Sequence, residues 1–300
     1  MVIKKIRFDN LEAYEVSTSI AKMIIVTGLG PRIAFLGKND GENLFYWKND
    51  DVGREGWRLL GGHRVWVSRP FADESEDAYA FDNDPCTVTN NSGELVITGT
   101  IHPVFKTQRG IRIRVIDENT FSVTNFLTNN SPFLYSGGVW AATCIDPRGG
   151  KEFAIPLGDR RLSWDVIKIV IPRKFANHSA PVHDEQITLT DDFMIVHPRG
   201  VETKRMVMAP LGICAMTYPK MNISFVKYHP FNRNARYPHE CNLAFYNAPN
   251  NLMFEMESYG EEQTVLPQAT IENLEIWKLL DTTMRWQKPE ELTSLFCDLV

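Results

Sequence analysis

The sequence predicts an all-β fold, a large antiparallel β-sandwich, and three observations lead to that prediction. Apolar and polar residues alternate with a period of two in many short segments, turn-forming sequences separate these segments, and no rhythm of strand, long helix and strand appears. Strands joined by tight turns pair antiparallel, because a parallel return needs a long crossover. We therefore expect one domain over residues 1–300 and exclude a doubly wound nucleotide-binding fold.

The expected strands lie mostly in the middle and the last third of the chain. In Ile111-Arg112-Ile113-Arg114-Val115, for example, apolar and charged residues alternate, so they take opposite faces of a strand. Asn90-Asn91-Ser92-Gly93 and Asp117-Glu118-Asn119 contain residues that favour chain reversal. The segments expected as strands are 95–101, 111–115, 121–126, 166–171, 193–196, 223–228 and 252–257.

One short helix is predicted near the C-terminal end. Pro289-Glu290-Glu291 suits a first helical turn, since proline tolerates that position and acidic residues complement the helix dipole. Leu292, Leu295, Phe296 and Leu299 then recur at the spacing of one helix face. We expect this helix to pack its apolar stripe on a sheet.

Composition and charge exclude several classes of partner. The chain has 300 residues with 43% hydrophobic and 23% charged residues, which is ordinary globular usage. Lys and Arg number 32 against 37 Asp and Glu, a formal charge of −5 with no basic run, so we expect no nucleic-acid partner. No stretch approaches about 18 uncharged apolar residues, so we expect no membrane partner.

Cysteine usage and the first residues favour a cytoplasmic location. The five cysteines are scattered and form no C-x-x-C pair, and the N-terminal segment lacks the apolar core of a signal peptide. His229, His239, Glu240 and Cys241 match no standard zinc spacing. No phosphate loop, dinucleotide fingerprint or nucleophile elbow is present, so we expect neither metal nor cofactor.

The segment 61–68 is the first candidate for chemistry. On a strand, His63 and Val65 share one face while Arg64 and Trp66 share the other. His63 can transfer a proton near neutral pH. Arg64 beside Trp66 offers donors for hydroxyls and a flat apolar surface, which together suit a polar ring. The alternative is that His63 and Trp66 are core residues of a strand.

Glu255 and Glu257 form the second candidate, because residues two apart on a strand share a face. Two neighbouring carboxylates repel each other, which raises the pKa of one of them, as a general base needs. The alternative is a solvated, charged strand face. A glycosidase acid and base is disfavoured, because two side chains that point the same way from one strand do not readily flank a scissile bond.

Histidines supply the third group of candidates. His229 and His239, together with Tyr237, lie in segments rich in residues that suit hydrogen bonding to a polyol. The remaining mid-chain histidines are interpreted as surface or loop residues. These are His178, His183 and His197.

Motifs spread over most of the chain resemble, in order, a family of uncharacterised bacterial proteins, the DUF4380 group. No single motif carries the resemblance, which depends on their order. The motifs are Gly30-Pro31-Arg32-Ile33, Gly61-Gly62-His63-Arg64-Val65-Trp66, Phe81-Asp82-Asn83-Asp84-Pro85, Val139-Trp140-Ala141, Asp146-Pro147-Arg148-Gly149-Gly150, Phe225-Val226-Lys227, Tyr237-Pro238, Glu255-Met256-Glu257, Leu266-Pro267 and Glu275-Ile276-Trp277-Lys278-Leu279.

That family is similar to aldose 1-epimerases, and the resemblance implies a galactose mutarotase-like supersandwich with a concave sheet that faces carbohydrate. It also implies a late strand at 270–280, although the Leu/Glu-rich pattern there is compatible with a helix. Two mutarotase features are not evident in the sequence: a second histidine in a mid-chain strand and an Asn-Arg pair ahead of the sugar site.

The resemblance also implies site roles. In mutarotases a histidine protonates the ring oxygen of the sugar while a glutamate removes the anomeric hydroxyl proton, and reclosure gives the other anomer. Glu257 matches the glutamate best, with Glu255 as the fallback, and His63 or His229 would be the acid. The expected substrate contacts are Arg64, Trp66, Trp140, Lys227, Glu255, Tyr237 and His239.

The sequence therefore favours a carbohydrate-active protein of the aldose-epimerase type. A carbohydrate-binding or sugar-sensing protein without turnover is the main alternative, and lyase or hydrolase chemistry on the same fold is another. The sequence names neither the sugar nor the oligomeric state.

Overall fold

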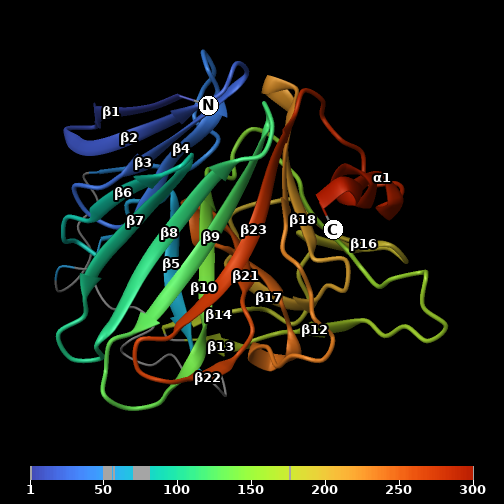
Figure 1. The fold of residues 1–300 in the computed structure, drawn as a ribbon. Helices are drawn as coiled ribbons and strands as arrows, with labels where there is room; N and C mark the ends of the chain where they lie inside the picture. Colours follow the sequence, from blue (N-terminus) through green and yellow to red (C-terminus); the bar gives the residue numbers. More distant parts are fainter. Residues whose placement is uncertain (1, 50–55, 57, 70–81, 176, 300) are drawn as a thin grey trace.

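Two large antiparallel sheets make up most of the molecule. A computed structural model describes residues 2–49, 56, 58–69, 82–175 and 177–299. Phe81, part of one motif named above, lies outside them. The described strands form an eleven-stranded sheet, a ten-stranded sheet and a two-stranded hairpin, with a short helix near the C-terminal end (Figure 1). The prediction of an all-β antiparallel sandwich is therefore confirmed.

The eleven-stranded sheet, called here the first sheet, combines the N-terminal strands with strands from the second half of the chain. In spatial order its strands are β1 (Val2–Phe8), β2 (Leu11–Ser17), β3 (Ala21–Val26), β4 (Arg32–Lys38), β5 (His63–Ser68), β10 (Tyr135–Ile145), β21 (Phe254–Tyr259), β20 (Leu243–Asn247), β17 (Thr203–Met208) and β12 (Lys168–Val170), with β22 (Gln263–Val265) paired to β10.

The ten-stranded sheet, called the second sheet, crosses in front of β5, β10 and β21 in Figure 1. In spatial order its strands are β15 (Ile187–Leu189), β16 (Phe193–Val196), β11 (Phe153–Pro156), β18 (Ile213–Tyr218), β19 (Ile223–Tyr228), β23 (Thr270–Leu280), β9 (Thr120–Asn129), β8 (Thr107–Val115), β7 (Glu94–Ile101) and β6 (Thr87–Asn91). The separate hairpin is β13 (Lys174–Phe175) and β14 (His178–Ser179), and short 3₁₀ helices lie at Pro219–Met221, Pro238–Glu240 and Pro249–Asn251.

The main core lies between the two sheets. Val65 and Val67 of β5 and Met256 of β21 meet Ile111 and Ile113 of β8 in one buried cluster. Residues two apart within a strand share a face, so the alternation seen in the sequence supplies the inward-facing side chains. Residues adjacent in sequence to these inward-facing residues therefore point to the outer face of the same sheet.

The C-terminal helix forms where the apolar spacing predicts it. Helix α1 spans Pro289–Thr293 and continues as the 3₁₀ helix Ser294–Leu299. Leu292 and Phe296 are buried in a second apolar cluster on the outer face of the second sheet. Burial of this apolar stripe stabilises a helix too short to persist alone in water.

Residues 270–280 form strand β23, as the resemblance implied, and not a helix. Ile271, Asn273 and Glu275 are buried while the alternate residues Glu272 and Leu274 are exposed. Pairing with β9 on one side and β19 on the other supplies backbone partners that outweigh the helical preference of Leu and Glu.

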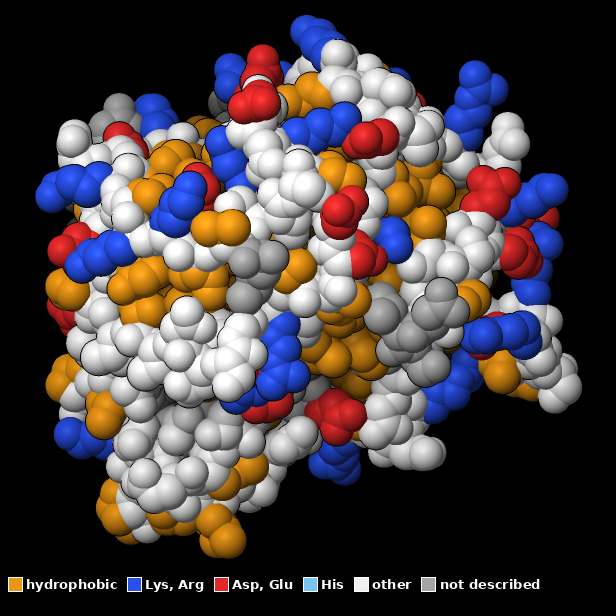
Figure 2. Space-filling view, turned by 45° about the horizontal axis from the view of Figure 1, so that its top comes forward, with side chains coloured by type: hydrophobic (Ala, Val, Ile, Leu, Met, Phe, Trp, Pro, Cys, Tyr) orange, Lys and Arg blue, Asp and Glu red, His pale blue; other side chains and the backbone are white. Residues whose placement is uncertain are grey.

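Acidic and basic side chains are interspersed on the face shown in Figure 2. Along the described part of the chain, no helix has both the length and the apolar character needed to cross a membrane.

Candidate functional site

The candidate site lies on the outer face of the first sheet, where β5, β10 and β21 are neighbours. Arg64 pairs with Ala142, and Ala142 pairs with Glu257, so these three side chains share a face. Trp66 and Trp140, each two residues away along its strand, pair with each other on the same face. Alternate residues of β5 face the core, so this set faces away from it. We call this surface, with Arg64, Trp66, Trp140, Glu255 and Glu257, the site face.

Glu257 is the centre of a buried hydrogen-bond network on the site face. Lys204 Nζ donates to both carboxylate oxygens, at 2.8 and 2.7 Å. Trp140 Nε1 donates to Oε2 at 3.0 Å, and the hydroxyl of Tyr259 donates to the same oxygen at 2.8 Å. Hydrogen bonds between a lysine ammonium and a carboxylate are short and strong, so this network fixes the position of the Glu257 side chain.

Glu255 lies on the same face of β21 and differs from Glu257 in its contacts. Cys144 Sγ donates to Glu255 Oε1 at 3.6 Å. Burial first, and then the negative charge of Glu257, raise the pKa of Glu255 from 4.5 to about 7, while Lys204 and Arg64 act in the opposite direction. A buried carboxyl with a pKa near neutrality can both accept and donate a proton under ordinary conditions.

Aromatic rings line the site face beside the carboxylates. The rings of Trp66 and Trp140 lie 4.7 Å apart at their centroids, and Tyr259 stacks on Trp140 at 5.7 Å with an interplanar angle of 21°. The Arg64 guanidinium lies 4.4 Å from the centre of the Trp66 ring. These surfaces are flat and apolar with polar groups at their edges, as a sugar ring requires.

Two arginines and an aspartate border the site face on the side of β4. Asp82 Oδ1 accepts from Arg32 Nη2 at 2.7 Å and from Arg64 Nη2 at 3.0 Å. Burial alone would raise the pKa of Asp82, but Arg32, Arg64 and Arg109 together hold it below its usual value. Asp82 therefore fixes the position of Arg64 as an ionised partner.

The β13–β14 hairpin covers another border of the site face. Phe175 packs edge-on against Tyr246, and Lys204 lies 5.8 Å from the centre of the Phe175 ring. His178 Nδ1 lies 2.8 Å from Glu202 Oε1, and the Tyr246 hydroxyl donates to the same oxygen at 2.8 Å. The side chain of His178 is 47% exposed, in agreement with its interpretation as a surface residue, and it contacts this border through Glu202 and Tyr246.

A hollow of about 990 Å³ lies at the far end of β17, and its described lining includes none of the five residues that define the site face. Met208 lines it, and Met208 shares a strand face with Lys204 because the two are four residues apart on β17. Tyr237 and His239 line the same hollow. Burial, together with the charges of Lys168 and Lys204, lowers the pKa of His239, which places this imidazole within electrostatic reach of the site.

His63 is not on the site face, which corrects its expected role as the acid. Its side chain points into the core, where Nδ1 lies 2.8 Å from Thr143 Oγ1 and Nε2 lies 2.8 Å from Asn125 Oδ1. Burial lowers the pKa of His63 to about 4, with the charge of Glu275 opposing this shift. Strand alternation is the cause, because His63 shares its face with Val65 and Val67.

Lys227 and His229 are not on the site face with Glu257. Lys227 lies on β19 of the second sheet, and His229 follows directly after that strand. Lys227 Nζ forms an ion pair with Glu275 at 2.7 Å and donates to Thr143 Oγ1 at 3.0 Å, in the interior between the sheets. His229 is buried just after β19 and donates from Nδ1 to the carbonyl oxygen of Leu274 at 3.0 Å. We therefore do not retain Lys227 as an expected substrate contact or His229 as a candidate acid.

Lys204 and Tyr259 contact Glu257 on the site face, and the sequence interpretation named neither as a candidate; Asp82 it named only as part of a motif. Lys204, Met206 and Met208 are two residues apart along β17, so they share one face of the strand. This spacing does not show which neighbouring strand supplies the ion-pair partner of Lys204. Its ion-pair partner Glu257 lies 53 residues later in the chain. Within the described residues, no group of three or more His, Cys, Asp or Glu side chains is placed to hold a metal ion.

Comparison with known proteins places the fold among galactose mutarotase-like proteins. A candidate aldose 1-epimerase from Escherichia coli K12 superposes with a TM-score of 0.63 at 9% identity, over 89% of this chain and 98% of that one. A galactose mutarotase-like protein from Lactobacillus casei ATCC 334 gives 0.60 at 11% identity, over 89% and 100%. One from Clostridium acetobutylicum gives 0.58 at 10% identity, over 94% and 99%.

No family model matches the chain, and no curated protein matches it. At these low identities the similarity to solved structures establishes the fold alone, a galactose mutarotase-like β-sandwich. The narrower resemblance to the DUF4380 group stays a prediction.

Proposed function

We propose that the protein catalyses acid/base exchange at the anomeric centre of a sugar hemiacetal, in the manner of an aldose 1-epimerase. The observation that carries this proposal is the buried pair of Glu255 and Glu257 on the site face, with the pKa of Glu255 raised to about 7. Perturbed carboxyl groups beside a binding surface are typical of catalytic sites. The fold, which is shared with galactose mutarotase-like proteins, supports the proposal.

In this proposal Glu255 is the base and Glu257 is its electrostatic partner. Lys204 donates to both carboxylate oxygens of Glu257, whereas Glu255 has no such lysine partner among its described hydrogen bonds and its pKa is raised to about 7. Glu255 accepts the proton of the anomeric hydroxyl, and the charge of Glu257 keeps the pKa of Glu255 near the working pH. This reverses the order of preference that the resemblance implied for the two residues.

We assign the acid role to His178. Its Nδ1 is hydrogen-bonded to Glu202, which orients the ring and leaves Nε2 for proton transfer to the ring oxygen. The ring also packs against Tyr246 at a centroid distance of 5.5 Å, which ties the hairpin to the site face. In this proposal the rings of Trp66 and Trp140 provide the apolar surface for the sugar ring.

Polarimetry of freshly dissolved α-D-glucose and α-D-galactose tests the proposal. The wild-type protein should accelerate the approach to anomeric equilibrium for at least one sugar. His178→Asn should lower the rate about 100-fold or more, since general acid catalysis contributes roughly that factor. His197→Asn is the matched control, because His197 is also partly exposed and paired with a glutamate, Glu152, and should leave the rate unchanged.

A carbohydrate-binding protein without turnover is the second candidate, and one observation favours it. The described hydrogen-bond partners of Glu257 are side chains of the protein itself, as in a structural ion pair. Binding of a sugar with anomer exchange at the buffer rate would support this candidate and contradict the proposed catalysis.

A further inference from the structure

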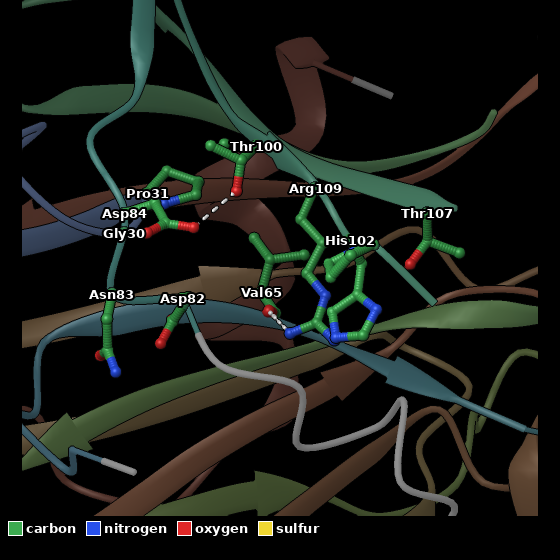
Figure 3. Close-up of a pocket in the computed structure, with 12 residues that line it drawn as sticks. Gly30, Pro31, Val65, Asp82, Asn83, Asp84, Thr100, His102, Thr107 and Arg109 are labelled. Atoms are coloured by element: carbon green, nitrogen blue, oxygen red, sulfur yellow. Dashed lines mark hydrogen bonds between the residues drawn. The ribbon is translucent and has the colours of Figure 1, made fainter. Parts of the chain in front are cut away.

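A second cavity, separate from the site face, lies where the two sheets meet beside β5. It has a volume of about 370 Å³. Val65 of β5, Gly99 of β7 and Arg109 of β8 line it, together with the loop 82–84 and the turn that contains His102 (Figure 3). Val65 points toward the second sheet while its neighbours Arg64 and Trp66 lie on the site face, so the cavity and the site occupy opposite sides of β5.

Thr107 gives this cavity an unsatisfied hydrogen-bonding group. Its side chain is 2% exposed, and its Oγ1 has no hydrogen-bond partner among the described residues. Figure 3 shows this hydroxyl directed toward the side where His102 and Arg109 lie. A buried hydroxyl without a partner is energetically unfavourable, so a ligand that supplies the partner gains binding free energy here.

Arg109 is a second polar group built into the cavity wall. It is 8% exposed, and its Nη1 donates to the carbonyl oxygen of Val65 at 3.4 Å. Asp82, on the other side of the cavity, is close enough for the charge of Arg109 to help lower its pKa. The guanidinium of Arg109 gives this wall of the cavity a positive charge and planar N–H donors, the chemistry that oxygen-rich ligands complement.

The lining favours a neutral ligand over a charged one. A phosphate would meet Asp82 and Asp84, while a cation would meet Arg109. Adjacent hydroxyl groups fit both, because a hydroxyl accepts from a guanidinium and donates to a carboxylate at the same time. Pro31, Val65 and Pro103 add an apolar surface for C–H groups.

We propose that this cavity binds a small neutral polyhydroxylated compound of monosaccharide size, as a binding site distinct from the site face. Its volume lies within the range of roughly 300–1,000 Å³ typical of small-molecule sites. The proposal does not depend on catalysis at the site face. Asp82 lines the cavity and also accepts from Arg64, so an occupant contacts a residue that positions the site face.

Isothermal titration of the full chain with methyl α-D-glucopyranoside, methyl α-D-galactopyranoside and myo-inositol tests the proposal. At least one probe should bind to Glu257→Gln, in which the site face is altered. Thr107→Val keeps the shape but removes the hydroxyl, and should weaken that binding about threefold, while Thr107→Ser should restore it. Arg109→Met should weaken the binding at least about tenfold.

The same titrations can overturn the proposal. Loss of all probe binding in Glu257→Gln, no binding of any probe to the wild type, equal affinities for wild type and Thr107→Val, or displacement of the probe by inorganic phosphate would each do so. Weaker probe binding in Thr107→Val together with unchanged anomer exchange would support a cavity that binds its ligand independently of the proposed catalysis.

Discussion

Lys204 Nζ lies 2.8 and 2.7 Å from the two carboxylate oxygens of Glu257, although β20 separates their strands. Lys204 pairs with Tyr246, and Tyr246 with Glu255, so Lys204 reaches Glu257 diagonally across the sheet. The long lysine side chain spans this offset beneath the cover of the hairpin residue Phe175. The two carboxyl groups therefore differ in environment: Glu257 is ion-paired to Lys204, whereas Glu255 has a pKa raised to about 7.

Lys204→Met should lower the free energy of unfolding by about 3–5 kcal/mol, because removal of one partner leaves a buried charge uncompensated. The two side chains are 9% and 0% exposed, so solvent does not replace the lost partner. Urea denaturation at pH 7 measures the change. Lys204→Met combined with Glu257→Gln should recover part of the loss, and a single variant as stable as the wild type would contradict the structural role of the pair.

The raised pKa of Glu255 predicts a pH dependence of stability. The folded state binds more protons than the unfolded state between pH 4.5 and about 7, so the free energy of unfolding should fall as pH rises through this window. Glu255→Gln lacks this contribution, so its stability relative to the wild type should increase from pH 4.5 to about pH 7. Thermal unfolding at several pH values measures the difference, and parallel curves would count against a raised pKa.

Gly62 should not tolerate alanine. Its φ is +70°, and a Cβ atom would lie 2.4 Å from the carbonyl oxygen of Ile33. Gly150 is the matched control, with φ +73° and open space within 4 Å of the position that a Cβ would take. Gly150→Ala should cost only the backbone strain of about 1–2 kcal/mol, whereas Gly62→Ala should cost clearly more. Equal losses in denaturant titrations would contradict the tight approach of Gly62 to β4.

Trp140 should report sugar binding through its fluorescence. Trp140→Phe keeps an aromatic ring but removes the indole donor to Glu257, so sugar affinity should fall about threefold to tenfold. Trp164→Phe is the control, because Trp164 is 83% exposed and distant in the sequence from the site strands. Addition of sugar should change the emission of wild type and Trp164→Phe. If the emission change on sugar addition were lost in Trp164→Phe and kept in Trp140→Phe, the sugar would not bind beside Trp140 and the proposed site would be contradicted.

The alternation of side chains along strands could be predicted from the sequence, and it accounts for most of the correct inferences. It placed Glu255 with Glu257 and Arg64 with Trp66, and the structure brings both pairs to one face. The sequence interpretation expected repulsion between two carboxylates to raise the pKa of one of them; the pKa of Glu255 is raised, first by burial and then by the charge of Glu257.

Alternation does not say which face of a strand points to the core, and this explains the misplacement of His63. Thr143, Asn125 and Glu275 surround the buried imidazole, and none of them neighbours it in sequence. The same holds for Lys227, whose partner Glu275 lies on β23. Such contacts depend on sheet order and strand register, which local sequence patterns do not specify.

The rate at which the protein interconverts the α and β anomers of a sugar tests the central claim most directly. Magnetisation-exchange NMR of an equilibrated α/β sugar mixture should show that the wild type accelerates exchange between the anomers, at a rate that rises as pH increases through about 7, the pKa of Glu255. Glu255→Gln should abolish this exchange while sugar binding remains measurable. Wild-type exchange at the buffer rate, or full activity of Glu255→Gln, would contradict the account.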